Sequence, residues 1–271
     1  MRVVGVVLAL LALAGCGGRE DDDSTTVVAA VYALAWAAER VGGDSIHVVN
    51  LISAGGEPHD VELSPRDVET IRDADLVIYA GGGFQPAVED AVEDRHGSSL
   101  DVLGAGEDPH VWLDPIRFAA AVGRIAERLG RADAVAGLVG ELRHLDEEYR
   151  RGLERCARRT LVTSHASFGH LVMRYDLTAL SLAGRSPEAE PGPRAIEQVV
   201  EAVRESGATT VFTEPLVSDR LAQTVAREAG VEVADLDPIE GLSEERLSAG
   251  EDYLSVMRDN LAALREALGC T

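Results

Sequence analysis

The sequence contains no lysine: its 25 basic residues are all arginine, against 47 acidic residues and a net charge of -22. This charge repels nucleic acid and anionic membrane surfaces, so we exclude both as direct ligands. Without lysine there is no Walker A motif, and an ATP-driven step must belong to another protein. The charge favours a cationic ligand only weakly, because excess Asp and Glu also keep a surface soluble.

Cysteine is scarce, with only Cys16, Cys156 and Cys270, and no CxxC pair occurs. A cysteine-based metal site is therefore not expected. In an oxidising compartment, Cys156 and Cys270 are interpreted as a disulfide that ties the C-terminus to the middle of the chain. Two buried free thiols are the alternative.

The apolar run after Arg2 extends only from Val3 to Ala14. It is shorter than the ~20 residues that span a bilayer, and it has the size of a secretory signal. We therefore assign 1–15 to a signal peptide. The run ends at a site that resembles the lipobox of bacterial lipoproteins, which predicts lipidation of Cys16 and a flexible tether over 16–26. The protein would then be anchored to the outer face of the cell membrane.

From Val27 onward, short Val- and Leu-rich segments alternate with amphipathic ones, and 46% of the chain is apolar, enough for a substantial core. This alternation predicts βαβ units and parallel sheets. We expect strands at 27–31, 46–51, 76–80, 160–163, 210–213 and 231–236. We expect helices at 32–42, 65–73, 85–95, 194–206, 218–229 and 249–268.

The middle of the chain breaks this alternation with two successive helical segments between 115 and 157, interrupted near Gly130. The second, Ala132 to Cys156, would extend ~37 Å over about 25 residues, enough to cross a domain. We therefore predict an α/β fold with two Rossmann-like lobes of parallel sheet, 27–130 and 158–271, joined by one long rigid helix over 131–157.

Three histidines have related surroundings. His59 and His110 each follow a proline that is itself preceded by an acidic residue, and proline fixes the backbone ahead of each ring. His165 comes just after an expected strand, where open α/β sheets place their ligands. Asp237 also follows an expected strand. Together these four residues, two from each lobe, predict a tetrahedral zinc site in the cleft between the lobes.

The other polar candidates are weaker. His47, His96 and His144 lie on an expected strand, a loop and a charged helix face, so no ligand role is assigned to them. His170 is close enough to His165 for a supporting or gating role. Glu214 either orients a ligand imidazole or caps the helix that follows.

Longer motifs surround these residues: Pro58-His59-Asp60, Asp108-Pro109-His110-Val111-Trp112-Leu113-Asp114-Pro115, Ser164-His165 with Phe168-Gly169, and Leu236-Asp237-Pro238. In these motifs the chain resembles the zinc and manganese uptake lipoproteins, the solute-binding proteins of ABC importers. The resemblance implies the periplasmic-binding-protein arrangement of two lobes and one rigid helix. It also implies a metal in the cleft and docking onto an ABC permease with its ATPase.

The chain departs from that family in two places. Many zinc-binding members carry a long His-rich loop ahead of the second ligand, whereas 97–107 is short, acidic and free of histidine. His170 stands where the family often has an aromatic residue. The fourth ligand varies within the family, so the resemblance assigns Asp237 by position alone.

The expected function is capture and transfer of Zn²⁺ by a monomer that is not an enzyme. Zinc is preferred over Mn²⁺ because three imidazoles suit it and Mn²⁺ binds most weakly in the intrinsic order. Affinity should fall as the histidines protonate below about pH 6.5.

Two alternatives remain. Three histidines and a water are also a catalytic pattern, so a zinc hydrolase or lyase is one rival, although no HExxH motif occurs. The other is a metal-sequestering or adhesin lipoprotein with no transport partner.

Overall fold

The computed structural model describes residues 24–59, 61–103, 108–184 and 192–271. The predicted signal peptide and the lipidation site at Cys16 lie outside the described residues. None of the helices in the described part of the chain has the length and apolar character needed to cross a bilayer.

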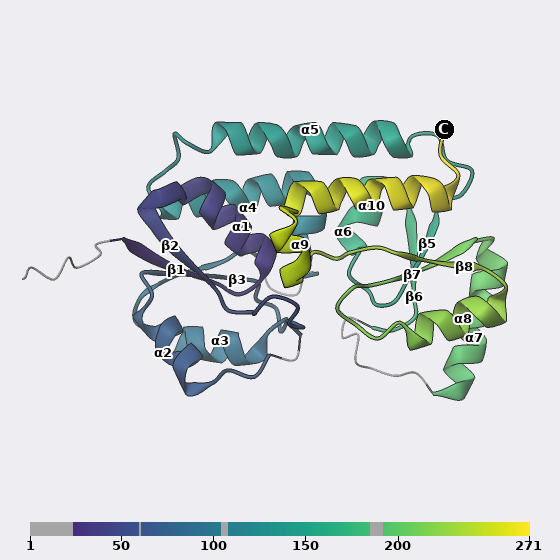
Figure 1. The fold of residues 1–271 in the computed structure, drawn as a ribbon, viewed down its shortest axis with the longest axis horizontal. Helices are drawn as coiled ribbons and strands as arrows, with labels where there is room; N and C mark the ends of the chain where they lie inside the picture. The colour runs from purple at the N-terminus through teal and green to yellow at the C-terminus, as the bar shows by residue number, and fades with distance from the viewer. Residues whose placement is uncertain (1–23, 60, 104–107, 185–191) are drawn as a thin grey trace, which may run out of the picture.

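The first lobe is built on a parallel four-stranded sheet with the strand order β2-β1-β3-β4. Its central strands are completely buried over much of their length, as expected for a sheet with helices on both faces (Figure 1). The strands are β1 (Thr25–Ala29), β2 (Ile46–Asn50), β3 (Leu76–Tyr79) and β4 (Ser98–Asp101), and the helices are α1 (Tyr32–Gly42), α2 (Pro65–Asp73), α3 (Pro86–Glu93) and α4 (Pro115–Arg128).

The second lobe repeats this topology, with a parallel sheet in the order β6-β5-β7-β8. It also has helices on both faces (Figure 1). Its strands are β5 (Thr160–Thr163), β6 (Thr178–Ser181), β7 (Thr210–Thr213) and β8 (Glu232–Asp235), and its helices are α6 (Gly169–Arg174), α7 (Pro193–Ser206) and α8 (Arg220–Ala229). The predicted fold class, two α/β lobes with parallel sheets, is confirmed.

The lobes are connected by α5 (Ala136–Leu153), which runs alongside both of them (Figure 1). It has 18 residues, fewer than the predicted 25, because 131–135 form turns and because Cys156 leaves the helix to pair with the C-terminus. Cys156 and Cys270 form a disulfide and an isolated antiparallel bridge. The predicted pairing is therefore present.

After β8 the chain returns to the first lobe, forms the short helix α9 (Glu244–Ser248), and crosses back along α10 (Tyr253–Leu268). The side chain of Asp252 accepts a hydrogen bond from Ser255 in a capping box that starts α10. The phenol of Tyr253 donates to the Trp112 carbonyl at 2.5 Å, which fixes the start of α10 against the first lobe. The returning segment thus places second-lobe sequence next to first-lobe loops.

Candidate metal centre

Four side chains converge between the two lobes: His59, His110, His165 and Glu240. One ligand atom from each lies within 4.8 Å of every other. His59 is on the loop after β2, and His110 follows β4. His165 lies just beyond the end of β5, and Glu240 is on the segment that returns to the first lobe after β8. The topology therefore brings together residues separated by up to 181 positions.

A single carboxylate oxygen is the focus of the group. Oε1 of Glu240 lies 2.7 Å from Nε2 of His110, 3.2 Å from Nε2 of His59 and 3.5 Å from Nε2 of His165. Only 2% of Glu240 is exposed, and His110 and His165 are completely buried. Three imidazole nitrogens and a carboxylate oxygen, all facing the same point, form a donor set that suits Zn²⁺.

The Nε2 atom of His165 makes no hydrogen bond to any residue that the structure describes, although it is buried. Buried polar atoms are nearly always paired in folded proteins. An orphaned ring nitrogen aimed at Glu240 and two other imidazoles is what a site for a bound cation requires. The residues present therefore fit a metal ion.

Two of the imidazoles also contact a carboxylate through Nδ1, the ring nitrogen that does not face Glu240. Nδ1 of His110 lies 2.6 Å from Oδ1 of Asp108, and Nδ1 of His165 lies 2.6 Å from Oε2 of Glu214. The other Glu214 oxygen accepts the His165 backbone N–H at 3.1 Å. Such partners commonly fix the tautomer and orientation of a ligating imidazole.

These contacts shift the ionisation of the group. Burial lowers the pKa of His165, but the carboxylates of Glu214 and Glu240 outweigh it and raise that pKa to about 10. The pKa of His110 is raised in the same way, by Asp108 and Glu240 against the effect of burial. Burial raises the pKa of Glu240, yet its contacts with the imidazoles of His110, His165 and His59 bring it well below its ordinary value. These shifts favour a protonated His165 beside an ionised Glu240 when no cation is bound.

Asp237, the predicted fourth ligand, lies outside this group of four side chains. Its Oδ2 forms an ion pair with Arg246, and its Oδ1 accepts the Ile239 N–H at 2.7 Å. Glu240, three residues later, supplies the carboxylate instead. The sequence held one signal for it, since Glu240 is the only acidic residue in the apolar run from Pro238 to Leu242.

The remaining histidines lie outside the group. His170 is buried and its Nε2 lies 2.8 Å from the Asp108 carbonyl oxygen, so it contacts the loop that carries His110. His47 and His96 are exposed, and His144 pairs with Glu148 on the surface of α5.

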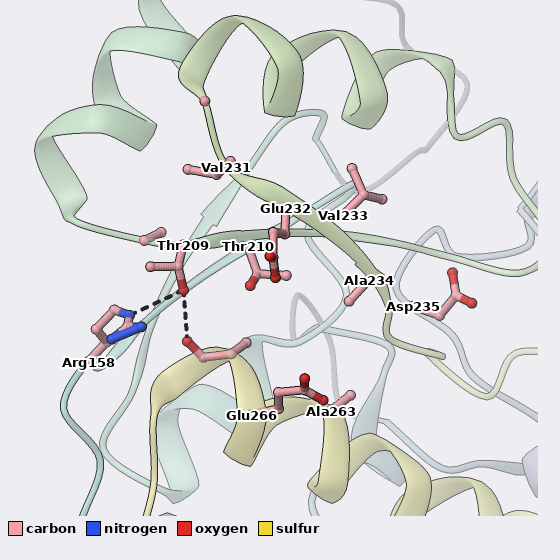
Figure 2. A pocket seen from close by; sticks show the side chains of 13 residues that line it. Arg158, Thr209, Thr210, Val231, Glu232, Val233, Ala234, Asp235, Ala263 and Glu266 are labelled. Atoms are coloured by element: carbon pink, nitrogen blue, oxygen red, sulfur yellow. Dashed lines mark hydrogen bonds between the residues drawn. The ribbon is translucent and has the colours of Figure 1, made fainter.

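A cavity of about 670 Å³ lies elsewhere, between β8, the start of β7 and α10 (Figure 2). Arg158 donates to the Thr209 hydroxyl at its edge, at 3.3 Å. Its lining includes Glu232, Asp235 and Glu266 but no histidine. The cavity is therefore separate from the histidine group.

Comparison with known proteins places these features in context. The family model described as "Zinc-uptake complex component A periplasmic" matches residues 27–267. The zinc-binding lipoprotein AdcA of Streptococcus pneumoniae is 31% identical over 306 residues, covering 98% of this chain and 61% of AdcA. The chain thus spans less than two thirds of that relative.

Two solved structures are similar. The Zn(II)-bound ZnuA-like domain of S. pneumoniae AdcA has a TM-score of 0.77 and 32% identity, covering 90% of this chain and 99% of the domain. The laminin-binding protein Lmb of Streptococcus agalactiae, described as bifunctional with adhesin and metal-transporting activity, has a TM-score of 0.82 and 29% identity. The match covers 90% of this chain and all of Lmb.

Proposed function

The chain belongs to the family of periplasmic zinc-uptake components, and from this premise we propose that it binds Zn²⁺ through His59, His110, His165 and Glu240 and delivers it for uptake. One observation carries the proposal. The Nε2 atoms of all three histidines lie within 3.5 Å of one Glu240 oxygen, in a site that is almost closed to water.

The donor set favours zinc over manganese. Three neutral imidazoles and one carboxylate match the four-coordinate tetrahedral preference of Zn²⁺, whereas Mn²⁺ prefers more oxygen ligands and binds most weakly in the intrinsic order. Manganese remains the alternative cargo, and competition between the two ions for the purified protein tests it.

Capture without catalysis follows from the number of protein donors. Catalytic zinc sites keep one position open for water or substrate. Here Glu240 supplies a fourth protein ligand, so no position is left in a tetrahedral shell. We therefore propose that the protein is not an enzyme. Hydrolysis of an ester by the zinc-loaded protein, abolished by His110→Ala, would revive the hydrolase alternative.

Delivery completes the proposed role. The resemblance to importer components supports an ABC permease and its ATPase as partners of a monomeric binding protein. We propose that residues 1–15 direct export, that Cys16 is lipidated at the outer face of the cell membrane, and that the tether is the part of the predicted 16–26 that precedes β1, because Thr25 and Thr26 pair with β2. Release of a Cys16→Ser variant from the membrane fraction would support the anchor, and retention of that variant would contradict it.

Surface adhesion is a second candidate, because the similar Lmb protein is described as both an adhesin and a metal transporter. The two roles separate in one assay. Loss of growth in zinc-depleted medium when the gene is deleted, restored by wild type but not by His110→Ala, supports uptake. Equal restoration by both would favour a role that needs no metal.

Metal analysis tests the central claim directly. Wild type should retain one zinc per chain after dialysis, and alanine variants of His59, His110, His165 and Glu240 should lose it. His144→Ala is the matched control, since it removes a surface imidazole that pairs with Glu148. Full zinc content in the three histidine variants would refute the proposal.

A further inference from the structure

Ile239, the residue just before Glu240, has an unusual backbone. Its φ of 58° lies in the left-handed region, although its side chain is β-branched and completely buried. This region is costly for a β-branched residue and persists only where the surroundings enforce it. The conformation next to Glu240 therefore needs a physical cause.

Asp237 provides the most direct restraint. Its Oδ1 accepts the N–H of Ile239 at 2.7 Å, which closes a tight turn over Pro238. Asp237 is itself fixed to α10, because its N–H donates to Oδ1 of Asn260 at 2.9 Å and its carbonyl accepts from Nδ2 of Asn260 at 2.6 Å. The buried Asn260 thus grips the backbone on which Asp237 sits.

Two further contacts hold the turn, one at Oδ2 of Asp237 and one at the Pro238 carbonyl. Oδ2 pairs with Arg246, and Arg246 pairs in turn with Glu251 on the segment before α10. From the first lobe, the indole N–H of Trp112 donates to the Pro238 carbonyl at 2.7 Å. The turn is therefore bound on both sides, by Arg246 and by Trp112, immediately before Glu240 in the sequence.

We propose that Asp237 is a positioning residue: it holds Ile239 in the left-handed conformation and so aims the Glu240 carboxylate at the three imidazoles, without contacting the metal. The proposal rests on the proposed function, in which Glu240 is a zinc ligand. It also explains why a carboxylate outside the donor group is buried this close to it, with only 6% of its surface exposed.

A double-mutant cycle tests the proposal, with zinc affinity measured by competition against a chelator. Asp237→Ala should weaken binding by about 10- to 100-fold, the range typical of residues that support metal ligands. Asp237→Asn keeps an oxygen for the Ile239 N–H and should stay within about fivefold of wild type, because the turn contact is retained and Arg246 keeps its ion pair with Glu251. Asp237→Ala combined with Glu240→Ala should bind no more weakly than Glu240→Ala alone.

Amide exchange supplies a readout that does not require metal. In the metal-free protein, Asp237→Ala should speed exchange across 237–242, while Asp237→Asn should not. The control is Asp235→Ala, which removes a nearby carboxylate that accepts from the Thr213 hydroxyl and does not touch the turn.

Additive affinity losses in the cycle would overturn the proposal, because Asp237 would then act on the metal independently of Glu240. Unchanged exchange in Asp237→Ala would overturn it as well. If wild type itself binds no zinc, the proposed function fails, and the exchange result still decides whether Asp237 holds the turn.

Discussion

The two lobes have the same strand order, yet they contribute to the metal centre differently. Matching the sheets strand by strand pairs β4 with β8, and the residues after these strands, His110 and Glu240, form the shortest contact in the group at 2.7 Å. The remaining donors break the symmetry. His165 follows the interior strand β5, whose counterpart β1 is followed by Ala30 and Val31. A shared topology fixes where donors can gather but not which residues supply them.

The support behind the rings differs as well. His110 is backed by Asp108, two residues earlier on the same loop, and the Asp108 side chain is 23% exposed. His165 is backed by Glu214, from the end of the neighbouring strand, and that side chain is 2% exposed. The carboxylate behind His110 is thus close in sequence and partly exposed, whereas the carboxylate behind His165 is distant in sequence and buried.

Removing one imidazole from each lobe should have the largest effect. His110→Ala and His165→Ala should each weaken zinc binding by more than about 100-fold, beyond the range for supporting residues, because a direct ligand is lost. Chelator competition measures both affinities. A large loss for one variant with near wild-type binding for the other would mean that a single lobe holds the metal.

Removing the supporting carboxylates should have the next largest effect and should separate the lobes. Glu214→Ala and Asp108→Ala should weaken zinc binding within about 10- to 100-fold, with Glu214→Ala the more severe. The reason is that a buried carboxylate interacts more strongly with its imidazole than a solvent-exposed one. The conservative variants Glu214→Gln and Asp108→Asn should recover part of each loss. A larger effect for Asp108→Ala would reverse the comparison.

The pH dependence should follow from the raised pKa values of His110 and His165. Because the pKa of His165 is raised to about 10, this ring is protonated at neutral pH without metal and zinc must displace its proton, and the raised pKa of His110 acts in the same direction. Affinity should fall by about tenfold per displaced proton for each unit of decrease in pH. For His165 this dependence should extend up to about pH 10, well above the 6.5 expected from an ordinary histidine. Calorimetry in buffers of different ionisation enthalpy counts the released protons, and zero release would contradict the prediction.

The same pKa shifts predict that the stability of the metal-free protein changes with pH in the opposite direction to zinc affinity, because stability should fall as the pH rises. A histidine with a raised pKa contributes its full stability below its unfolded value, near 6.5, and loses it as the pH rises through the folded value. The metal-free protein should therefore lose stability between about pH 6.5 and 10, the value for His165. Thermal unfolding measures this trend, and His165→Gln should flatten it.

Breaking the disulfide should affect zinc affinity least. The Cys156–Cys270 link closes a loop with a sequence separation of 114 and joins the chain just after α5 to the chain just after α10. Replacing both cysteines by serine should lower the free energy of unfolding by about 2 to 5 kcal/mol. Zinc affinity should change by less than about threefold, because no donor is displaced. A large affinity loss would show that the bridge sets the spacing of the lobes.

Local pattern predicted the elements that are buried and periodic. The predicted interior strands and long helices are present, because continuous apolar runs and helical spacing report burial directly. The strands β4 and β6 were not predicted. Both lie at sheet edges, as do β2 and β8, but their short segments, Ser98–Asp101 and Thr178–Ser181, contain no valine, whereas valine marks the segments of β2 and β8. A strand of this composition forms because a neighbouring strand pairs with it, and sequence pattern does not record that partner.

The four residues of the donor group also differ in how well the sequence predicts them. His59, His110 and His165 could be singled out because proline or a strand end precedes each of them. Glu240 was harder to single out, because its position depends on the left-handed turn at Ile239 and on contacts with Trp112 and Asn260 far away in sequence. Proximity to a strand end pointed to Asp237 instead. Only the fold shows that the carboxylate of Asp237 is already paired with Arg246.

The indole of Trp112 gives the protein a built-in optical reporter. It is completely buried, its ring centroid is 5.5 Å from that of His110, and its N–H is bound to the carbonyl of Pro238 beside the Glu240 turn. A cation bound beside His110 changes the charge next to the indole, so the emission of Trp112 should change when the site is filled. The only other tryptophan, Trp36, packs against Phe118 and Tyr253. Occupancy of the centre can thus be followed by native fluorescence, without a dye.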